Sequence, residues 1–397
     1  MRNGAVASLL VVAILVGAAA GYLAGYANER TVTSVSTYAS TSTSTLTYAS
    51  TVVETTTVTA NSATTTMGGT PIPIASVETG NVSIGGTPWD TIAVNPNASR
   101  IYVAGGSNIL TVVDAASHAV VARVTLPSDS NSGIAIDYKT GTVYVLVQDG
   151  IAVINGTTNH VVGEIPVDFG YRSIAFDSST DTLYGSPETV SFSNPVGYLV
   201  GVDARTEAVT ANVSIGYWAS DIVVNSQLNL VYAVGCNQQG LVCDSMISVV
   251  NGTSAKLINE TTLGSAYYAT TTIDERTGFV YVSGESQLVA LNPYGTVIFN
   301  YYPDTCGPFI GMADDPAQNQ VIMAPQNYNY LLVYNGWFGS LLNMYSLPVS
   351  PQYVSFNPVT NETYVIVSES LLTFRGIAST GHVNGTLIGA DQFCNPP

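Results

Sequence analysis

Residues 91–126 read TIAVNPNASRIYVAGGSNILTVVDAASHAVVARVTL, four short apolar runs separated by turn-forming residues. The runs are TIAVN, RIYVAGG, ILTVVD and AVVARVTL, and each is rich in β-branched or aromatic side chains. Asn, Asp, Gly and Ser stand between them, which is typical of short antiparallel strands joined by tight turns. This stretch therefore predicts one four-stranded antiparallel sheet.

The same pattern recurs to the end of the chain. A first apolar run ends in Asp or Asn seven times, at Asn95, Asp137, Asp177, Asn225, Asp274, Asp315 and Asn357. Seven positions later stands Tyr102, Tyr144, Tyr184, Tyr232, Tyr281, Ile322 or Tyr364. A third run ends at Asp114, Asn155, Asp203, Asn251, Asn292 and Asn335, with Arg375 in the corresponding place of the last repeat. The spacing of the first markers is 40 to 49 residues, as in β-propeller blades.

We therefore predict an all-β fold, a seven-bladed β-propeller of four-stranded antiparallel blades over residues 70–397. The Asp or Asn after each first strand is expected to cap its turn, and each tyrosine to bury its ring between blades while its hydroxyl reaches a polar partner. The segment 72–84 resembles the last strands of a blade and is expected to pair with the final blade, closing the ring. Whether it replaces or supplements the strand-like segment 382–390 stays open. A sandwich or a solenoid fits the regular period less well.

The repeat resembles the YVTN family of β-propeller repeats, named for a tetrapeptide in the second strand. The residues that carry the resemblance are NPNASRIYVA from Asn95 and DERTGFVYVSG from Asp274. The Thr-Asn pair of the tetrapeptide is missing throughout, and the sixth repeat has QVIMAP in place of a tyrosine strand. The resemblance implies a propeller of the archaeal or bacterial cell surface, a binding or structural module without a defined chemistry.

The amino-terminal residues 1–30 predict a transmembrane anchor or signal segment. Residues 5–23 contain no charge, and about 20 apolar residues span a membrane as a helix. Arg2 precedes them, so the positive-inside rule places the remainder outside. A retained anchor is favoured over a cleaved signal, which usually has a shorter apolar core. We expect a cell-surface protein with an extracellular propeller, or alternatively a secreted one.

Residues 31–69 predict an extended stalk. Between positions 31 and 66, 22 of 36 residues are Ser or Thr, and the sequence TYAST occurs twice. Such a segment buries too little apolar surface to offset its chain entropy. An O-glycosylated stalk, an unmodified disordered linker and a rod of extended strands remain alternatives.

Sequons and cysteines agree with export. Asn-x-Ser/Thr sites, where N-glycosylation is expected, occur at Asn81, Asn97, Asn155, Asn212, Asn251, Asn259, Asn361 and Asn384. The four cysteines lie after the stalk, as extracellular disulfides would require. We predict pairing of Cys236 with Cys243 and of Cys306 with Cys394; buried free thiols are the alternative.

Composition excludes one class of partner. The chain carries 10 basic against 27 acidic residues, a formal net charge of −17, so a basic groove for nucleic acid is excluded. Only 9% of residues are charged, from which we expect stability to depend little on pH. With three histidines, no metal site and no cofactor are predicted.

The candidate ligand site is the mouth of the central channel. The loops that lead into the innermost strands carry Trp89, Tyr171, Trp218, Tyr268 (or Tyr267), Phe309 and Tyr353. These aromatics would stack on sugar rings or clamp a peptide; alternatively they plug the channel and wedge the blades apart. Acidic residues in or near the same loops (Asp90, Asp129, Asp221, Asp314) are weaker candidates for calcium, since no complete calcium loop is present.

No catalytic residue is predicted. The chain has no GxSxG nucleophile elbow, and its histidines (His118, His160, His382) fall in turns expected at the outer rim. The sequence therefore favours a non-enzymatic, surface-anchored binding or scaffold module whose partner is a glycan, a protein or the envelope layer. The alternative is a secreted propeller enzyme of lactonase-like or lyase-like type that acts at the channel.

Overall fold

The computed structural model describes residues 33–39, 51–57, 78–85, 91–169, 173–187, 197–239, 242–265, 270–284, 287–301 and 308–375. The chain divides into two compact units, residues 1–69 and 70–397. In the first, β1 (Thr33–Ala39) pairs antiparallel with β2 (Thr51–Thr57), both within the Ser/Thr-rich segment. The predicted membrane segment 5–23 lies outside the described residues, among which no helix is long and apolar enough to cross a membrane.

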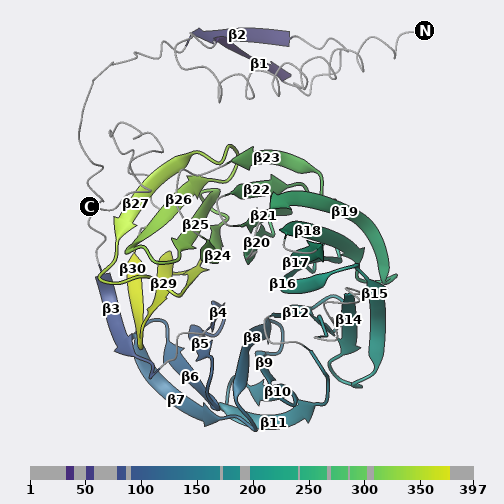
Figure 1. The fold of residues 1–397 in the computed structure, drawn as a ribbon. Coiled ribbons are helices and arrows are strands. Elements are labelled where there is room, and N and C mark those ends of the chain that lie inside the picture. Colours follow the sequence, from purple (N-terminus) through teal and green to yellow (C-terminus); the bar gives the residue numbers. More distant parts are fainter. Residues whose placement is uncertain are drawn as a thin grey trace, which may run out of the picture. The chain divides into compact units, whose positions relative to one another are not determined.

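The second unit is a seven-bladed β-propeller of four-stranded antiparallel sheets (Figure 1). Blade 1 holds β4 (Thr91–Asn95), β5 (Arg100–Ala104), β6 (Ile109–Asp114) and β7 (Ala119–Thr125); blade 2 holds β8 (Ser130–Asp137), β9 (Thr142–Val147), β10 (Gly150–Asn155) and β11 (His160–Ile165). Blade 3 holds β12 (Ile174–Asp177), β13 (Thr182–Gly185), β14 (Tyr198–Asp203) and β15 (Val209–Ser214); blade 4 holds β16 (Trp218–Asn225), β17 (Leu230–Gln239), β18 (Val242–Asn251) and β19 (Lys256–Ser265). Blade 5 holds β20 (Thr270–Asp274), β21 (Phe279–Ser283), β22 (Leu288–Leu291) and β23 (Val297–Tyr301); blade 6 holds β24 (Phe309–Asp315), β25 (Gln320–Pro325), β26 (Tyr330–Asn335) and β27 (Leu341–Ser346). Blade 7 holds β28 (Tyr353–Asn357), β29 (Glu362–Val367), β30 (Ser370–Arg375) and β3 (Glu78–Ser83).

The first strand of each blade lies innermost, and β28 of blade 7 contacts β4 of blade 1, so the ring is closed. Two faces follow from the antiparallel order. We call turn face the edge that carries the hairpins between first and second and between third and fourth strands. The mouth face is the opposite edge, where each innermost strand begins.

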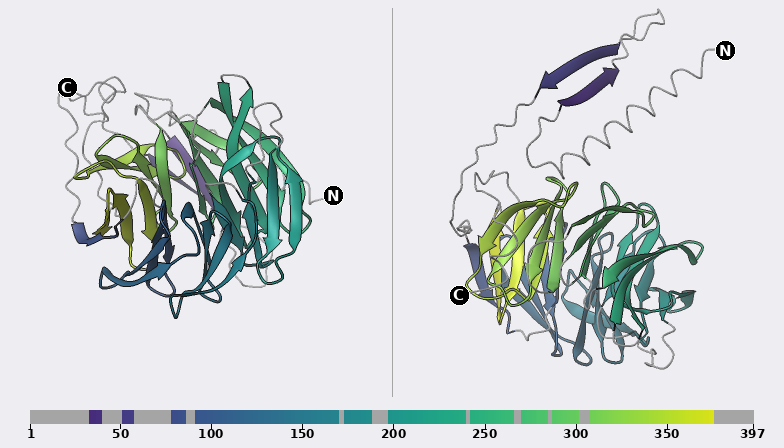
Figure 2. Two further views of the ribbon diagram at one scale, coloured as in Figure 1. Left: turned by 60° about the horizontal axis from the view of Figure 1, so that its bottom comes forward. Right: turned by 45° about the horizontal axis from the view of Figure 1, so that its top comes forward.

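The closing strand is β3, the outermost strand of blade 7, which Figures 1 and 2 show in blue beside the yellow β30. Its register places Asn81 opposite Leu372 and Ser83 opposite Ser370. Arg123 of β7 holds the end of β3, because its Nη1 donates to the Ile84 carbonyl at 2.9 Å. The predicted closure by segment 72–84 is confirmed for Glu78–Ser83, whereas segment 382–390 lies outside the described residues.

The turn caps predicted after the first strands are present, and the Asp and Asn markers that end the third strands form caps as well. All thirteen Asp and Asn markers accept hydrogen bonds from backbone N–H groups two to four positions later in their own turns. Asp177, for example, accepts from the Ser179 N–H at 2.8 Å. In most of these turns the fourth residue after the cap has a positive φ, such as 55° at His118 and 54° at Asn229.

The six marker tyrosines are buried, none more than 6% exposed, and each packs in a seam between blades, where their rings fill apolar volume. The hydroxyl of Tyr184 donates to the Gly252 carbonyl of the next blade at 3.2 Å, and that of Tyr232 to the Pro293 carbonyl at 2.9 Å. Tyr364 donates to Glu362 at 2.9 Å. The Tyr102 hydroxyl is buried without a partner, so the expected polar contact is not general.

Candidate functional site

Three of the predicted mouth aromatics fall within the described residues, each as the first residue of an innermost strand. Trp218 and Tyr353 are half-buried at the mouth end of β16 and β28. Phe309 is only 1% exposed and packs with Tyr281 and Met312 in the core between blades 5 and 6. This position fits the alternative that an aromatic fills space between blades. Trp89, Tyr171, Tyr267 and Tyr268 lie outside the described residues.

Among the described residues of the channel wall, Asp221 of β16 is a carboxylate that accepts three hydrogen bonds. Its Oδ1 accepts from the Ser173 hydroxyl of blade 3 at 2.9 Å and from the Ile222 N–H at 2.9 Å. Its Oδ2 accepts from the Thr271 N–H of blade 5 at 2.8 Å. A β-bulge between Ala219 and Asp221 shifts the register of β16 at this point. Asp221 thus joins the inner strands of three consecutive blades.

Burial raises the pKa of Asp221 to about 6, although the bonds from Ser173 and Thr271 oppose the shift. Tyr353 enters from blade 7, on the far side of the ring. Burial raises the pKa of its hydroxyl, and the nearby charge of Asp221 adds to the effect.

The other end of the channel has a second tyrosine. Tyr138 belongs to the first hairpin of blade 2, and its hydroxyl donates to the Val94 carbonyl of blade 1 at 3.5 Å. Its side chain is 50% exposed, and local desolvation of the hydroxyl raises its pKa, with a further contribution from the charge of Glu275 of blade 5.

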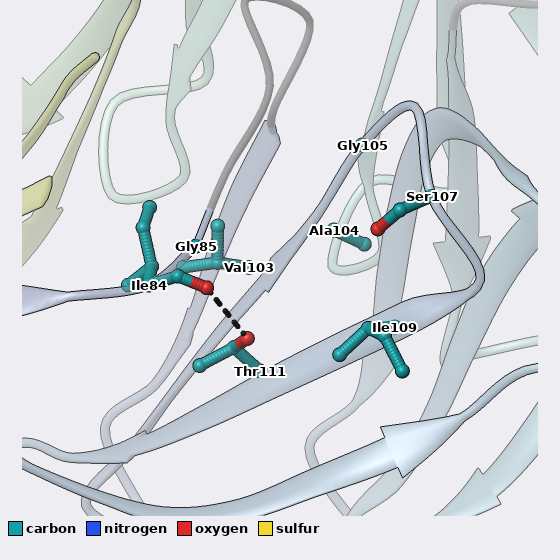
Figure 3. Close-up of a pocket in the computed structure, with 8 residues that line it drawn as sticks. All are labelled: Ile84, Gly85, Val103, Ala104, Gly105, Ser107, Ile109 and Thr111. Atoms are coloured by element: carbon teal, nitrogen blue, oxygen red, sulfur yellow. Dashed lines mark hydrogen bonds between the residues drawn. The ribbon is translucent and has the colours of Figure 1, made fainter. Parts of the chain in front are cut away.

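A small pocket lies where β3 passes into blade 1 (Figure 3). Its lining is Ile84, Gly85, Val103, Ala104, Gly105, Ser107, Ile109 and Thr111, and it has room for about one water molecule. The Thr111 hydroxyl donates to the Ile84 carbonyl at 3.3 Å, and Arg123 donates to the same carbonyl. The pocket belongs to the ring closure and does not offer ligand chemistry.

The turn face displays large side chains that the sequence reasoning did not select. Leu228, Tyr294, Trp337, Phe338 and Val359 are 45%, 59%, 44%, 65% and 70% exposed. Each stands two or three residues after a cap, where the turn directs side chains to solvent. The backbone N–H of Trp337 donates to Asn335 Oδ1 at 2.9 Å, and its ring packs edge-on against Phe279 with the ring centroids 5.1 Å apart. Their position two or three residues after a capping Asn is the sequence feature that could have identified these exposed side chains.

The predicted modification sites differ in accessibility. The side chains of Asn81, Asn97, Asn155 and Asn212 are exposed, whereas Asn251, Asn259 and Asn361 are half-buried. The Asn259 Nδ2, which a glycan would occupy, donates to the Tyr294 carbonyl at 3.0 Å. In the β17–β18 pair, Cys236 lies opposite Ser245 and Cys243 opposite Gln238, so the cysteines stand in diagonal register positions. Asn384, Cys306 and Cys394 lie outside the described residues, and both disulfides stay predictions.

Two histidines are described. His118 lies at the seam between blades 7 and 1, with its Nε2 3.6 Å from Glu362 Oε1. His160 is exposed on β11, and its Nδ1 lies 2.7 Å from the Thr158 carbonyl. Within the part of the chain that the structure describes, no three His, Cys, Asp or Glu side chains are arranged to hold a metal ion.

No family model matches the sequence, and no curated protein matches it. Among solved structures, the chain is similar to Kuenenia stuttgartiensis hydrazine synthase (TM-score 0.64, 13% identity), over 78% of this chain and 100% of that chain. It is also similar to the Cps50 (Swd1) β-propeller domain of Myceliophteria thermophila (TM-score 0.59, 9% identity), over 75% of this chain and 99% of that one. At these identities the likeness establishes the seven-bladed β-propeller fold alone.

Proposed function

We propose that the protein is a non-enzymatic binding or scaffold module, displayed outside the cell on an amino-terminal membrane anchor. The observation that carries the proposal is Asp221. Its two oxygens accept three hydrogen bonds from blades 3, 4 and 5, so this channel carboxylate serves the ring and is not free to act on a substrate. Among the described residues of the channel wall, this carboxylate is thus held by the ring, which supports recognition over chemistry.

The path of the chain favours the mouth face as the binding face. β3 begins at Glu78 on the turn face, since Glu78 pairs with Phe374 near the end of β30. The segment that precedes β3 is therefore joined at the turn face. The mouth face, with the half-buried Trp218 and Tyr353, lies at the opposite edge, and there we place recognition of a glycan, a protein or a neighbouring envelope component.

The finer assignment to a YVTN-like family of cell-surface proteins rests on the repeat residues alone. The apolar segment 5–23, the Ser/Thr-rich segment 31–69 and the four exposed sequon asparagines support a glycosylated, surface-anchored or secreted protein.

One observation favours the enzymatic alternative. Burial raises the pKa of Asp221 to about 6, and the charge of Asp221 in turn raises the pKa of the Tyr353 hydroxyl, a combination that also occurs in active sites. A lactonase-like or lyase-like reaction would use such a pair as acid and base. Because Asp221 already has its hydrogen-bond partners, recognition remains the proposal that the geometry supports better.

Binding of the full chain, purified in detergent, to glycan and peptide arrays tests the proposal. We expect reproducible binding to one ligand class, lost in Trp218→Ala and retained in the matched turn-face variant Trp337→Ala. Absence of binding to any class, or equal loss in both variants, would count against recognition at the mouth.

A further inference from the structure

One position in the seams between blades breaks the apolar pattern. The residue before each first-strand cap faces the preceding blade, and it is Val94, Ile136, Phe176, Val224, Ile273, Asp314 or Phe356. Six of the seven are large and apolar, and all are buried or half-buried. In blade 6 alone this position is an acid, Asp314 of β24, which packs toward blade 5.

Both carboxyl oxygens of Asp314 are inaccessible to solvent and accept no hydrogen bond. Met312, two residues earlier on the same side of β24, packs with Tyr281 and Leu288 of blade 5. Asp314 thus stands where its counterparts fill a hydrophobic seam. A buried carboxylate without donors is costly, and such a group takes up a proton instead.

The charged groups around Asp314 do not supply a counter-ion. Asp274 of β20 is fully buried on the blade 5 side, and its Oδ1 accepts two turn N–H bonds. Arg276 Nη2 lies 3.5 Å from Asp274 Oδ2 and is 57% exposed, so it serves Asp274. Tyr281 and the adjacent Asp315 are the other titratable groups nearby.

These surroundings agree with a pKa of Asp314 far above that of an ordinary aspartate. Burial raises the pKa of Asp314 to about 8, the charges of Asp274 and Asp315 add to the effect, and Arg276 opposes it. In the unfolded chain an aspartate has a pKa of about 3.9, so the folded protein holds this proton more tightly. The stabilisation is complete below the unfolded value and disappears as pH rises through the folded one.

We propose that the seam between blades 5 and 6 is a proton-dependent junction. Below about pH 8 Asp314 is a neutral carboxylic acid that packs as its apolar counterparts do. Its ionisation places a second negative charge beside Asp274 in a dry seam and weakens the contact between β20, β21 and β24. The consequence is a ring that closes most firmly in acidic surroundings, a property independent of the binding function proposed above.

Thermal unfolding of the full chain from pH 5 to pH 9 tests the junction. We expect the wild-type midpoint to fall by several degrees between pH 5 and pH 8 and little further at pH 9. Asp314→Asn and Asp314→Leu should remove most of this fall and melt above the wild type at pH 9. Asp149→Asn, at an exposed turn, is the matched control and should keep the wild-type slope. Variants that retain the wild-type pH slope would overturn the proposal.

A second measurement does not depend on variant stability. Infrared difference spectra of the wild type should contain the carbonyl band of a protonated carboxylic acid at pH 7, lost by pH 10. Absence of that band at pH 7 would overturn the proposal. Stabilisation at pH 8 by calcium or sodium alone, removed in Asp314→Asn, would also overturn it, because the two carboxylates would then hold a cation in place of a proton.

Discussion

At the scale of single residues, the repeat is built on turn chemistry that a sequence can reveal. A cap needs only a short side-chain acceptor at one position, so all thirteen caps could be predicted from Asp and Asn alone. The residue after each third-strand cap is small in six blades: Ala115, Gly156, Ala204, Gly252, Pro293 and Gly336. The structure supplies the reason, because this residue packs against the marker tyrosine of the preceding blade, as Gly336 does against the Tyr281 hydroxyl. Sequence reasoning missed it because the two partners are about one repeat apart.

Gly336 permits a test of this packing. A Cβ added there would lie 2.6 Å from the Tyr281 hydroxyl and 2.7 Å from Asn319 Oδ1. Gly336→Ala should therefore lower the free energy of unfolding by about 1–3 kcal/mol. Tyr281→Phe removes the hydroxyl, so the double variant should lose less than the sum of the two single losses. Chemical denaturation of the four proteins measures this; strict additivity would show that the hydroxyl is not the obstacle.

At the scale of strands and blades, the period predicted the number of sheets and the segment that closes the ring. It did not determine whether segment 72–84 replaces or supplements segment 382–390, since both are short runs of mixed apolar and polar residues. Nor could it predict the channel partners of Asp221. The bulge in β16 changes which side chains point inward, and Ser173 and Thr271 are each about 50 residues away. The exposed aromatics of the turn face, Tyr294, Trp337 and Phe338, were not predicted, because single turns of this kind carry no repeated aromatic signal in the sequence.

The closing strand has a matched pair of glycines. A Cβ at Gly80 in β3 would lie 2.5 Å from His118 Nδ1 of blade 1, whereas one at Gly163 in β11 meets only Val153 at 4.0 Å. Gly80→Ala should therefore push β3 away from blade 1 and speed hydrogen exchange in β3 and β30. Gly163→Ala, also in an outermost strand, should leave exchange in its blade nearly unchanged. Equal behaviour of the two variants would contradict closure through β3.

At the scale of the whole molecule, the expectation of little pH dependence needs refinement. Burial raises the pKa of Asp221 to about 6 and of Asp314 to about 8. Hydrogen bonds and nearby cations hold the pKa of Glu362 below its usual value, although burial opposes them, and turn N–H bonds do the same for Asp114. The two sets act in opposite directions as pH changes.

Asp221 and Asp314, whose pKa values are raised, stabilise the fold fully below about pH 4 and lose this contribution as pH rises to about 8. Glu362 and Asp114, whose pKa values are lowered, stabilise the fold above about pH 4 and lose this contribution as pH falls below that value. We therefore predict maximal stability in mildly acidic solution, near pH 4–6. Chemical denaturation at pH 3, 5, 7 and 9 measures the profile. A maximum at pH 8 or above would contradict the assignment of Asp221 and Asp314.

The central claim is that the propeller recognises a partner at the mouth and leaves it chemically unchanged. Mass spectrometry of the ligand class identified on the arrays, incubated with excess full-length protein at pH 5 and pH 7, tests it most directly. The account predicts quantitative recovery of intact ligand over many hours, with the Asp221→Asn variant altering only stability. Steady formation of a hydrolysed, eliminated or ring-opened product by the wild type, abolished in Asp221→Asn, would contradict it and establish an enzyme.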